Sequence, residues 1–436
     1  MLSPDSRTSR GPADDDALLL HERKRALSTR EMLCLSTFWM GYGLCWCLIT
    51  VVTQPAHIAK LVDKSRKGEA MAIVSIISAV VNIFVAVFYA QQNDRFHSRW
   101  GRRRPSMLVG AVLMCISLFF LQASHTLTAY TVSFVIFTFA SIIASVPFNG
   151  LVADIVGSEQ KGLVSAFLGT ASLVGYLAGA ILGTFYDFLG DTALNVIVGF
   201  IFLGSTLHTC VFTSEPPSYP LAPVSVKTLV QNIVTPFKTK DFTLVFISRL
   251  LFQLAINTIQ QFLSFWITDI VEIPSGMAAT TACSFALLPL LISSPISNGI
   301  LAIPSVSRRL GPRRKIIVYI SALIFIISFL CLTLASSFTS ALLISALFGL
   351  AYGPFLSIEF AMAMDVLVSK ADYGRDLSLW HNALVLPQLL ATPIAGWLRD
   401  VGEAQGKGLG YNLIWTMCIV YVILGVGVTR KIQGVQ

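Results

Sequence analysis

The feature that most constrains this chain is a series of long apolar stretches separated by short polar segments. About 20 consecutive apolar residues are enough for one helix to cross a lipid bilayer. The first 31 residues are polar and charged, and the apolar stretch that follows is too long for the hydrophobic core of a cleavable signal peptide. We therefore expect an all-α membrane protein that crosses the bilayer many times.

The composition excludes the main alternatives. The chain is 55% hydrophobic and only 12% charged, whereas a soluble domain carries about 25% charged residues. The net charge of +8 does not indicate a nucleic-acid partner, because the basic residues lie in short loops instead of on one face or in one tail. The eight cysteines lie in apolar stretches without a C-x-x-C pair. We expect free thiols and neither a metal site nor a cofactor.

Twelve spans are predicted, in two sets of six that enclose a polar linker. The first set covers residues 32–53, 70–90, 106–124, 127–149, 163–186 and 192–213. The second set covers residues 242–269, 277–302, 316–335, 338–363, 378–400 and 409–429. The predicted domains are a disordered tail (1–31), an N-terminal six-helix bundle (32–213), a linker (214–241), a C-terminal six-helix bundle (242–430) and a short tail (431–436).

The basic residues orient the spans. With both termini in the cytosol, 24 Lys and Arg residues lie on the inner side and six on the outer side. Cytoplasmic loops of membrane proteins carry this excess of positive charge. The first outer loop is the exception, because it holds Lys60, Lys64, Arg66 and Lys67.

The two halves of the chain resemble each other. The segment 101–105 (GRRRP) after the second span matches the segment 311–315 (GPRRK) after the eighth, and Asp154 and Asp365 close the fourth and tenth spans. Two six-helix repeats with the same orientation are typical of a secondary transporter. The two aspartates are expected to be structural residues that pair with basic residues of adjacent loops.

A family resemblance supports this interpretation. Residues 94–105 read DRFHSRWGRRRP, and residues 147–154 read PFNGLVAD. Over residues 32–430 the chain resembles the major facilitator superfamily, and these two segments are similar to those of sucrose–proton and related glycoside–cation symporters. The resemblance implies alternating-access transport of a sugar, glycoside or similar small polar solute, with a proton as coupling ion.

The sequence departs from that family pattern at three positions. Ala90 replaces a small glycine before the signature, and Thr138 occupies the place of the acidic residue that takes the coupling proton in plant sucrose symporters. Asn149 occupies the place of a basic residue. These changes leave the coupling ion open, and with it the choice between symport and uniport.

The signature segment has two interpretations. In the family, it forms a conformational latch on the cytosolic side; the residues that match are Asp94, Arg95, Gly101, Arg102, Arg103 and Arg104. A carboxylate here can pair with the arginines or face a helix N-terminus. The same arginines can also serve only to anchor the topology.

The seventh span carries the clearest candidate for a solute site. Five polar residues fall on one helical face over three turns: Arg249, Gln253, Asn257, Gln260 and Gln261. Amide groups both donate and accept hydrogen bonds, which suits sugar hydroxyls. The alternative is hydrogen bonding between helices, but four amides and a charge on one face favour a cavity.

Further candidates lie on other spans. Tyr42 and Trp46 on the first span offer ring faces on which a sugar can stack, although Trp and Tyr are also common membrane anchors. Asn149, Trp380 and Asn382 complete the predicted substrate-binding set. For proton transfer the candidates are Glu359, Arg249 as its partner, and His381, because low dielectric favours the protonated form of a carboxyl group. A static ion pair is the alternative.

The N-terminal tail contains acidic residues ahead of paired leucines. Asp15, Leu19 and Leu20 resemble the acidic dileucine signal that sorting adaptors bind, which would direct the protein to endolysosomal or vacuolar membranes; the plasma membrane stays open. No nucleophile motif or metal-ligand spacing indicates an enzyme. Two other functions remain open, a non-transporting sensor or assembly partner and a uniporter for a non-sugar solute.

Overall fold

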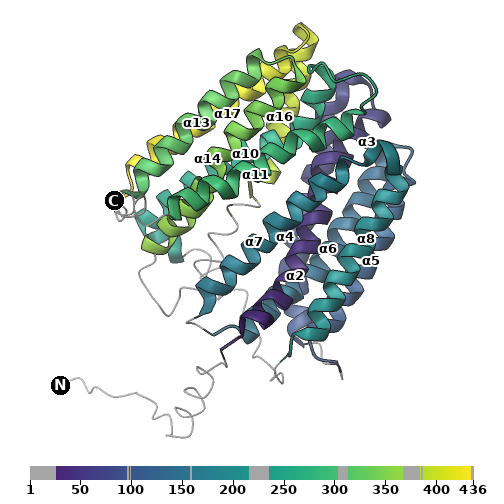
Figure 1. Cartoon of the computed structure of the whole chain (residues 1–436), viewed down its shortest axis with the longest axis vertical. Coiled ribbons are helices and arrows are strands. Elements are labelled where there is room, and N and C mark those ends of the chain that lie inside the picture. Colours follow the sequence, from purple (N-terminus) through teal and green to yellow (C-terminus); the bar gives the residue numbers. More distant parts are fainter. Residues whose placement is uncertain are drawn as a thin grey trace, which may run out of the picture.

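The computed structural model of the chain describes residues 26–95, 98, 100–157, 160–215, 235–302, 313–366, 383 and 386–433. Across these residues the regular structure is helical, and the helices form two bundles (Figure 1). This confirms the prediction of an all-α membrane protein with two six-helix bundles. Backbone groups in a bilayer must hydrogen-bond within the protein, and helices achieve this within a single segment.

The first bundle begins with a long broken helix. It consists of α2 (Thr29–Trp46), a π-helical segment η1 (Cys47–Thr53) and α3 (Gln54–Leu61), followed by the short 3-10 turn η2 (Lys64–Arg66). The other helices of this bundle are α4 (Lys67–Arg95), α5 (Arg104–Gln122), α6 (Leu127–Ile155), α7 (Lys161–Gly183) and α8 (Tyr186–Phe212).

The second bundle follows the 3-10 turn η4 (Thr235–Lys238). Its helices are α10 (Lys240–Asp269), α11 (Ala279–Ala302), α13 (Arg314–Leu334), α14 (Phe338–Val366), α16 (Leu386–Gln405) and α17 (Leu409–Arg430). Within the described ranges, eleven helical segments are long and apolar enough to cross a membrane. The remaining long helix of this bundle is α16, which has 20 residues and carries Arg399, Asp400 and Glu403 near its end.

The eleventh predicted span differs from the structure at its C-terminal end. The sequence predicts a span over residues 378–400, whereas α16 continues to Gln405. Near this end, Arg399 is buried in the protein, whereas Asp400 and Glu403 are half-buried. Of the segment 378–385, only Ala383 belongs to the described residues.

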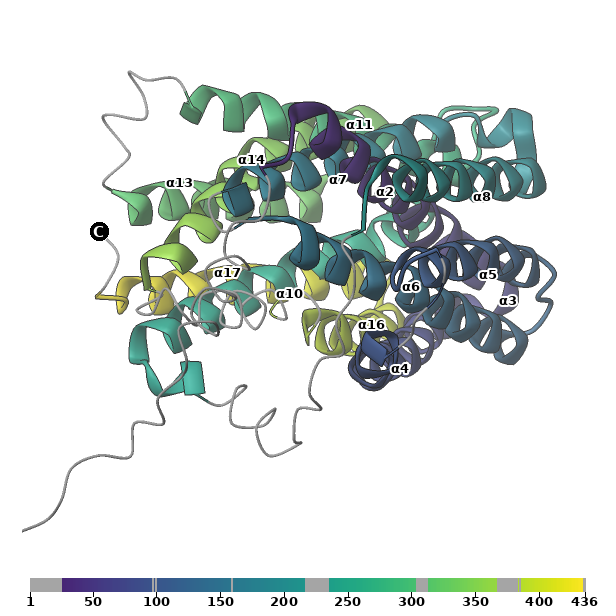
Figure 2. The ribbon, with the colours of Figure 1, turned by 90° about the horizontal axis from the view of Figure 1, so that it is seen from below.

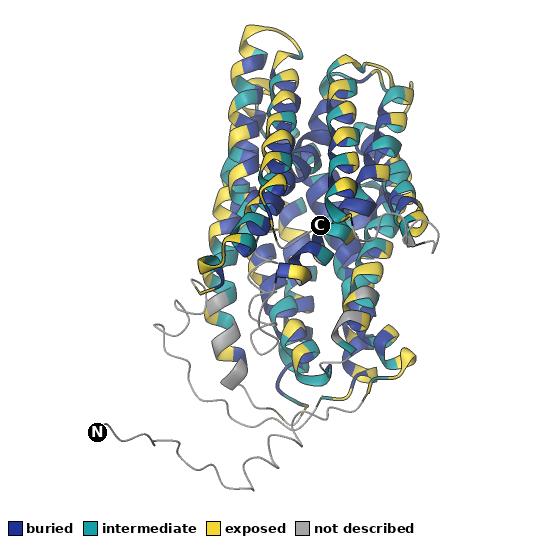
Figure 3. Cartoon of the chain, turned by 90° about the vertical axis from the view of Figure 1, so that its left-hand side faces the viewer, coloured by how far each residue is buried: buried dark blue, intermediate teal, exposed yellow. Residues whose placement is uncertain are grey.

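The outer surface of the helices is strongly apolar. Phe84, Phe188 and Leu334 are 72%, 86% and 87% exposed, and exposed positions follow the outward faces of the helices (Figure 3). A water-soluble monomer does not expose apolar side chains over so wide an area. These faces are suited to lipid acyl chains.

The bundles contact each other at one end. We call the side where α2 begins and α17 ends the terminal side, and the opposite side the distal side. On the distal side α4 lies beside α16, and η1 and α7 lie against α11 (Figures 1 and 2). Toward the terminal side, the ribbons of the two bundles diverge (Figure 1).

Close packing of α2 against α7 holds the first bundle together. Gly43 on α2 faces the carbonyl oxygen of Ser172, and Gly175 on α7 faces that of Met40. Small residues at such contacts let two helix backbones approach each other in a membrane. On α7, Gly175 and Gly179 therefore have a packing role against α2, whereas Gly183, one turn further on, faces Ser284 on α11 of the second bundle.

A Gly175→Ala substitution should destabilise the protein by about 1–3 kcal/mol, which is typical of overpacking. The new Cβ would overlap the Met40 carbonyl oxygen and lie 3.0 Å from the Leu44 backbone nitrogen, and neither atom can move away easily. Gly169→Ala on the same helix is the control, because no atom lies within 4 Å of its Cβ position. Thermal unfolding in detergent should show a lower midpoint for Gly175→Ala alone, and equal midpoints would contradict this.

Candidate functional site

The polar face predicted on the seventh span lies inside the protein. Gln253 is 3% exposed and Asn257 is 6% exposed, while Gln260 and Gln261 are half-buried. Asn257 donates a 2.9 Å hydrogen bond to the backbone oxygen of Gln253. These amides are therefore turned into the protein and away from the lipid-facing surface.

The opposite face of α10 packs against α17. Ser248 and Thr429 are joined by a 2.7 Å hydrogen bond between their hydroxyl groups, and the Cys418 thiol lies 3.9 Å from the backbone oxygen of Ala255. Ala255 is two residues from Gln253, which is about 200° around a helix. The amide face of α10 thus points away from α17.

A buried ion pair lies at one end of this face. The Nε atom of Arg249 on α10 is 3.8 Å from a carboxylate oxygen of Glu359 on α14, and both side chains are 5% exposed. This distance is too long for a hydrogen bond. Tyr352, two turns from Glu359 on α14, lies near both charges.

Several buried polar atoms on this face of α10 and on Glu359 have no hydrogen-bond partner within the described part of the chain. They are Nε2 of Gln253, Oε1 of Gln261 and both carboxylate oxygens of Glu359. More than 90% of buried polar groups in proteins are hydrogen-bonded. An unsatisfied one costs about 1–3 kcal/mol. The set therefore has the character of a binding site for a polar molecule.

The aromatic residues of α2 face the interior of the first bundle. The Tyr42 ring stacks on the Phe38 ring, with ring centroids 5.9 Å apart, and the Trp46 ring meets the Phe137 ring at a centroid distance of 5.6 Å. The ring centroids of Tyr42 and Trp46 lie 5.8 Å apart. Both are half-buried members of an aromatic cluster formed by α2, α6 and α8.

Tyr176 on α7 is a residue that the sequence did not single out. It lies near Tyr42 of its own bundle and near Tyr352 of the other bundle. The three tyrosines therefore extend from the aromatic cluster toward the Arg249–Glu359 pair. No sequence signal marked Tyr176, because it stands alone on a helix dominated by small and aliphatic residues.

The arginines of the signature segment contact their own bundle. Arg102 and Arg103 lie 2.7 Å and 3.2 Å from the Asp154 carboxylate, and Arg103 donates a 2.9 Å hydrogen bond to Asn93. The Glu215 carboxylate accepts the backbone N–H groups of Arg102 and Arg103, each at 2.8 Å.

This network ties the start of α5 to the ends of α4, α6 and α8. The Arg104 guanidinium adds a hydrogen bond to the Thr213 backbone oxygen, and Gly101 has a φ angle of 103°, a conformation that favours glycine. These contacts of Arg102, Arg103 and Arg104 lie within the first bundle and the residues that directly follow it. The side chains of Asp94 and Arg95 lie outside the described residues, so the latch stays a prediction.

The remaining predicted site residues lie on helices other than α10 or outside the described residues. Asp365 is 2.6 Å from Arg314 at the terminal end of the second bundle, and Asn149 is exposed on α6. Outside the described residues lie Trp380, His381 and Asn382, together with Asp15, Leu19 and Leu20 of the tail.

The distal side holds a charged cluster that the sequence did not reveal. The Asp269 carboxylate at the end of α10 lies 2.7 Å from Lys67 Nζ of the other bundle and 3.0 Å from Arg399. The Tyr411 hydroxyl donates to it at 2.6 Å. The only hint in the sequence was the excess of basic residues in the first outer loop, where Lys67 lies.

The comparison with protein families agrees with this architecture. The profile described as Major Facilitator Superfamily matches residues 32–371. The chain belongs to the Major Facilitator Superfamily. It is thus a multi-pass membrane protein with the fold of that family, as its repeat and signature segment predict.

Solved transporter structures share this superfamily fold. The nucleoside transporter NupG superposes with a TM-score of 0.69 and 16% identity, over 93% of this chain and 99% of that one. A bacterial homologue of the human lysosomal transporter Spinster, in an inward-facing and unoccupied conformation, superposes with a TM-score of 0.68 and 14% identity. The match covers 92% of this chain and 96% of that one. The POT family transporter PepTSo superposes with a TM-score of 0.68 and 13% identity, over 94% of this chain and 99% of that one.

Two curated proteins match part of the chain. A general alpha-glucoside permease from Schizosaccharomyces pombe is 26% identical over 212 residues, and a membrane-associated transporter protein from Mus musculus is 23% identical over 217 residues. The matches cover 43% and 45% of this chain, and 38% and 40% of those proteins.

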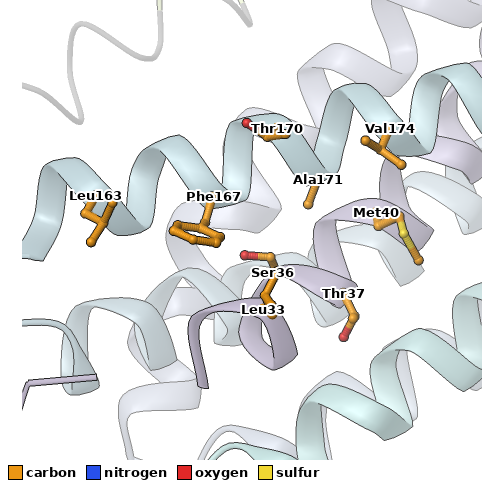
Figure 4. A pocket seen from close by; sticks show the side chains of 9 residues that line it. All are labelled: Leu33, Ser36, Thr37, Met40, Leu163, Phe167, Thr170, Ala171 and Val174. Atoms are coloured by element: carbon orange, nitrogen blue, oxygen red, sulfur yellow. The ribbon is translucent and has the colours of Figure 1, made fainter. Parts of the chain in front are cut away.

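A separate apolar pocket of about 410 Å³ lies between α2 and α7 (Figure 4). Its α2 residues include Leu33, Thr37 and Met40. Met40 is two residues from Tyr42 and so lies about 200° around the helix from it. This pocket is thus on a different face of α2 from the aromatic cluster and away from the polar site.

An Asp154→Asn substitution should destabilise this superfamily member by about 3 kcal/mol, because two buried arginines would lose their carboxylate partner. Arg102 and Arg103 are each 5% exposed. The control is Asp365→Asn, which removes a single, more exposed pair (28% and 33% exposed) worth no more than about 1 kcal/mol. Thermal unfolding in detergent compares the two, and equal losses would contradict the buried role of Asp154.

Proposed function

We propose that this protein is a secondary active transporter for a small hydroxyl-rich solute, with sugars and glycosides as the solute class and a proton as the coupling ion. The observation that carries the proposal is the set of buried polar atoms without partners that runs along α10 and includes the Glu359 carboxylate near Arg249. Transporters of this architecture bind solutes near the membrane midplane, between the two repeats.

The chemistry of these atoms suits hydroxyl groups. A hydroxyl both donates and accepts hydrogen bonds. The amide nitrogen of Gln253 can donate to it, and the amide oxygen of Gln261 and the carboxylate of Glu359 can accept from it. The half-buried rings of Tyr42 and Trp46 offer the apolar surface that a sugar ring needs on its other side.

The comparisons support the same solute class. The partial match to a general alpha-glucoside permease points to glycosides, as does the resemblance of residues 94–105 to glycoside–cation symporters. Neither observation selects one particular solute.

Glu359 is the best candidate for the proton carrier. Thr138 cannot take this role, because a threonine hydroxyl does not ionise in this pH range and donates a 2.9 Å hydrogen bond to the Phe134 backbone oxygen. Glu359 is 4% exposed, and Arg249 is near enough to stabilise its ionised form without a direct hydrogen bond from Nε. Binding of the solute then changes the balance between the ionised and protonated forms of the Glu359 carboxyl group.

The arrangement of the bundles fits one step of alternating access. The bundles meet at the distal side, and the charge distribution predicts that the terminal side faces the cytosol. The described state would then be the one that exchanges solute with the cytosol.

Uptake into proteoliposomes tests the function directly. Purified protein should take up at least one radiolabelled sugar or glycoside from a panel, and an inwardly directed proton gradient should increase accumulation. A uniporter would equilibrate the solute without responding to the gradient. No uptake of any panel member, with stable binding to a protein partner, would replace transport by an assembly role.

Gln253→Ala and Asn257→Ala should each raise KM for the accepted solute by about fivefold, since a lost hydrogen bond is worth about 1 kcal/mol. Gln122→Ala provides a matched amide control, because Gln122 is a half-buried residue at the distal end of α5 that bonds Thr192 and Asn195 of its own bundle. Initial uptake rates measure KM. Unchanged KM in both variants would remove the amide face from the binding site.

Glu359→Gln should abolish accumulation driven by the proton gradient and preserve solute exchange at equal concentrations, because glutamine cannot ionise. Glu403→Gln makes the same change at a distal position, where Glu403 accepts the Gly408 backbone N–H at 2.9 Å, and should behave as wild type. Accumulation and exchange are measured across a series of pH gradients. A wild-type response in Glu359→Gln would assign the proton to another residue.

A further inference from the structure

The distal cluster joins the two bundles through side chains that are almost fully buried. Lys67 is 4% exposed and Arg399 is 2% exposed, and the Asp269 carboxylate lies between them. The Lys67 ammonium also lies 5.6 Å from the centre of the Phe265 ring on α10. Lys67 comes from the first bundle, whereas Asp269, Arg399 and Tyr411 belong to the second.

A second carboxylate of this cluster caps a helix of the other bundle. Asp400 on α16 accepts the backbone N–H groups of Gly68 and Glu69 at 3.0 Å and 2.7 Å. These groups lie in the first turn of α4, where the helix has no internal acceptors for them and favours negative charge. Arg399 holds the Asp400 carboxylate at 2.8 Å and donates to the Lys64 backbone oxygen at 2.6 Å.

The backbones approach each other at the same place. A methyl group at Gly68 would overlap the carbonyl oxygen of Gly396, and a methyl group at Gly396 would overlap that of Gly68. Two helices from different bundles thus touch through glycines directly beside the charged cluster. A larger residue at either position would act as a wedge.

We propose that Lys67, Asp269, Arg399 and Asp400 form a distal gate that holds this side of the transporter closed. Separation of the bundles removes Lys67 from Asp269 and the α4 N-terminus from Asp400. It leaves Asp269 with Arg399 and Tyr411, and Asp400 with Arg399, because these partners belong to the same bundle. Neither carboxylate is left without a partner, so the gate can open and close reversibly.

The gate lies on the opposite side from the latch that the signature segment predicts. Breaking a contact that exists in one conformation shifts the population toward the other. The inference rests on the proposed transport cycle only for the existence of a second state. Its test follows the position of the bundles and needs no solute, so gate and transport can fail independently.

A disulfide reporter measures the closed distal side. The Cβ position of Gly183 on α7 is 3.0 Å from Cβ of Ser284 on α11, close to the spacing of about 3.5–4.5 Å in disulfides. A Gly183→Cys, Ser284→Cys chain with a protease site in the linker stays in one piece after cleavage only when the bundles are cross-linked. The same chain without the two new cysteines measures the background from native thiols.

In this reporter, Lys67→Met, Asp269→Asn and Asp400→Asn should each slow cross-linking by about fivefold or more, which is a typical size for such couplings. Lys67→Arg should retain the wild-type rate. Gly68→Ala should also slow the reaction, although it changes no charge. The control is Asp191→Asn, which breaks the exposed distal pair of Lys60 and Asp191 inside the first bundle and should leave the rate unchanged.

Thermal unfolding of each variant separates gating from stability. A wild-type cross-linking rate in Lys67→Met and Asp400→Asn would overturn the gate. Slower cross-linking that comes with loss of the folded transition would also count against it, because that result reports unfolding. Slower cross-linking in folded variants, rescued by Lys67→Arg, would establish it even if no tested solute is transported.

Discussion

The hydrocarbon interior of a membrane offers no hydrogen bonds, and this constraint governs every polar group in the structure. Backbone groups satisfy it through helices. Polar side chains satisfy it only when they face protein or water, so their positions separate the inner face of each helix from the outer one. On α10, Gln253 and Asn257 face inward, opposite the contacts with α17. The site exists because the same rule excludes these amides from the lipid-facing surface.

The two sides of the molecule use their charges differently. On the terminal side, the described ion pairs, such as Arg102–Asp154 and Arg314–Asp365, stay within one bundle. On the distal side, Lys67 and Asp400 reach across the interface. Pairs within a bundle keep it rigid during a movement, whereas pairs between bundles depend on the movement. The charges of one state therefore indicate which parts move as units and which contacts must break.

The sequence predicted what depends on local periodicity. Spans follow from runs of apolar residues, and the face shared by Arg249, Gln253 and Asn257 follows from helical spacing. Local periodicity could not pair Lys67 with Asp269, because these residues lie 202 positions apart. It also could not place Tyr176 near the second bundle. The basic first outer loop looked like an exception to the charge rule. In the structure, Lys67 has Asp269 as a partner across the interface, while Lys60 and Arg66 have carboxylate partners within their own bundle.

Helix α10 connects the candidate site to the distal cluster. Its polar face runs from Arg249 to Gln261, and Asp269 lies at its distal end. Eight residues separate Gln261 from Asp269, which is about 12 Å along a helix. In the proposed transport cycle, a solute at the amide face or a proton on the Arg249–Glu359 pair would act on the same helix that carries Asp269. The proposed gate would then respond to what occupies the proposed site.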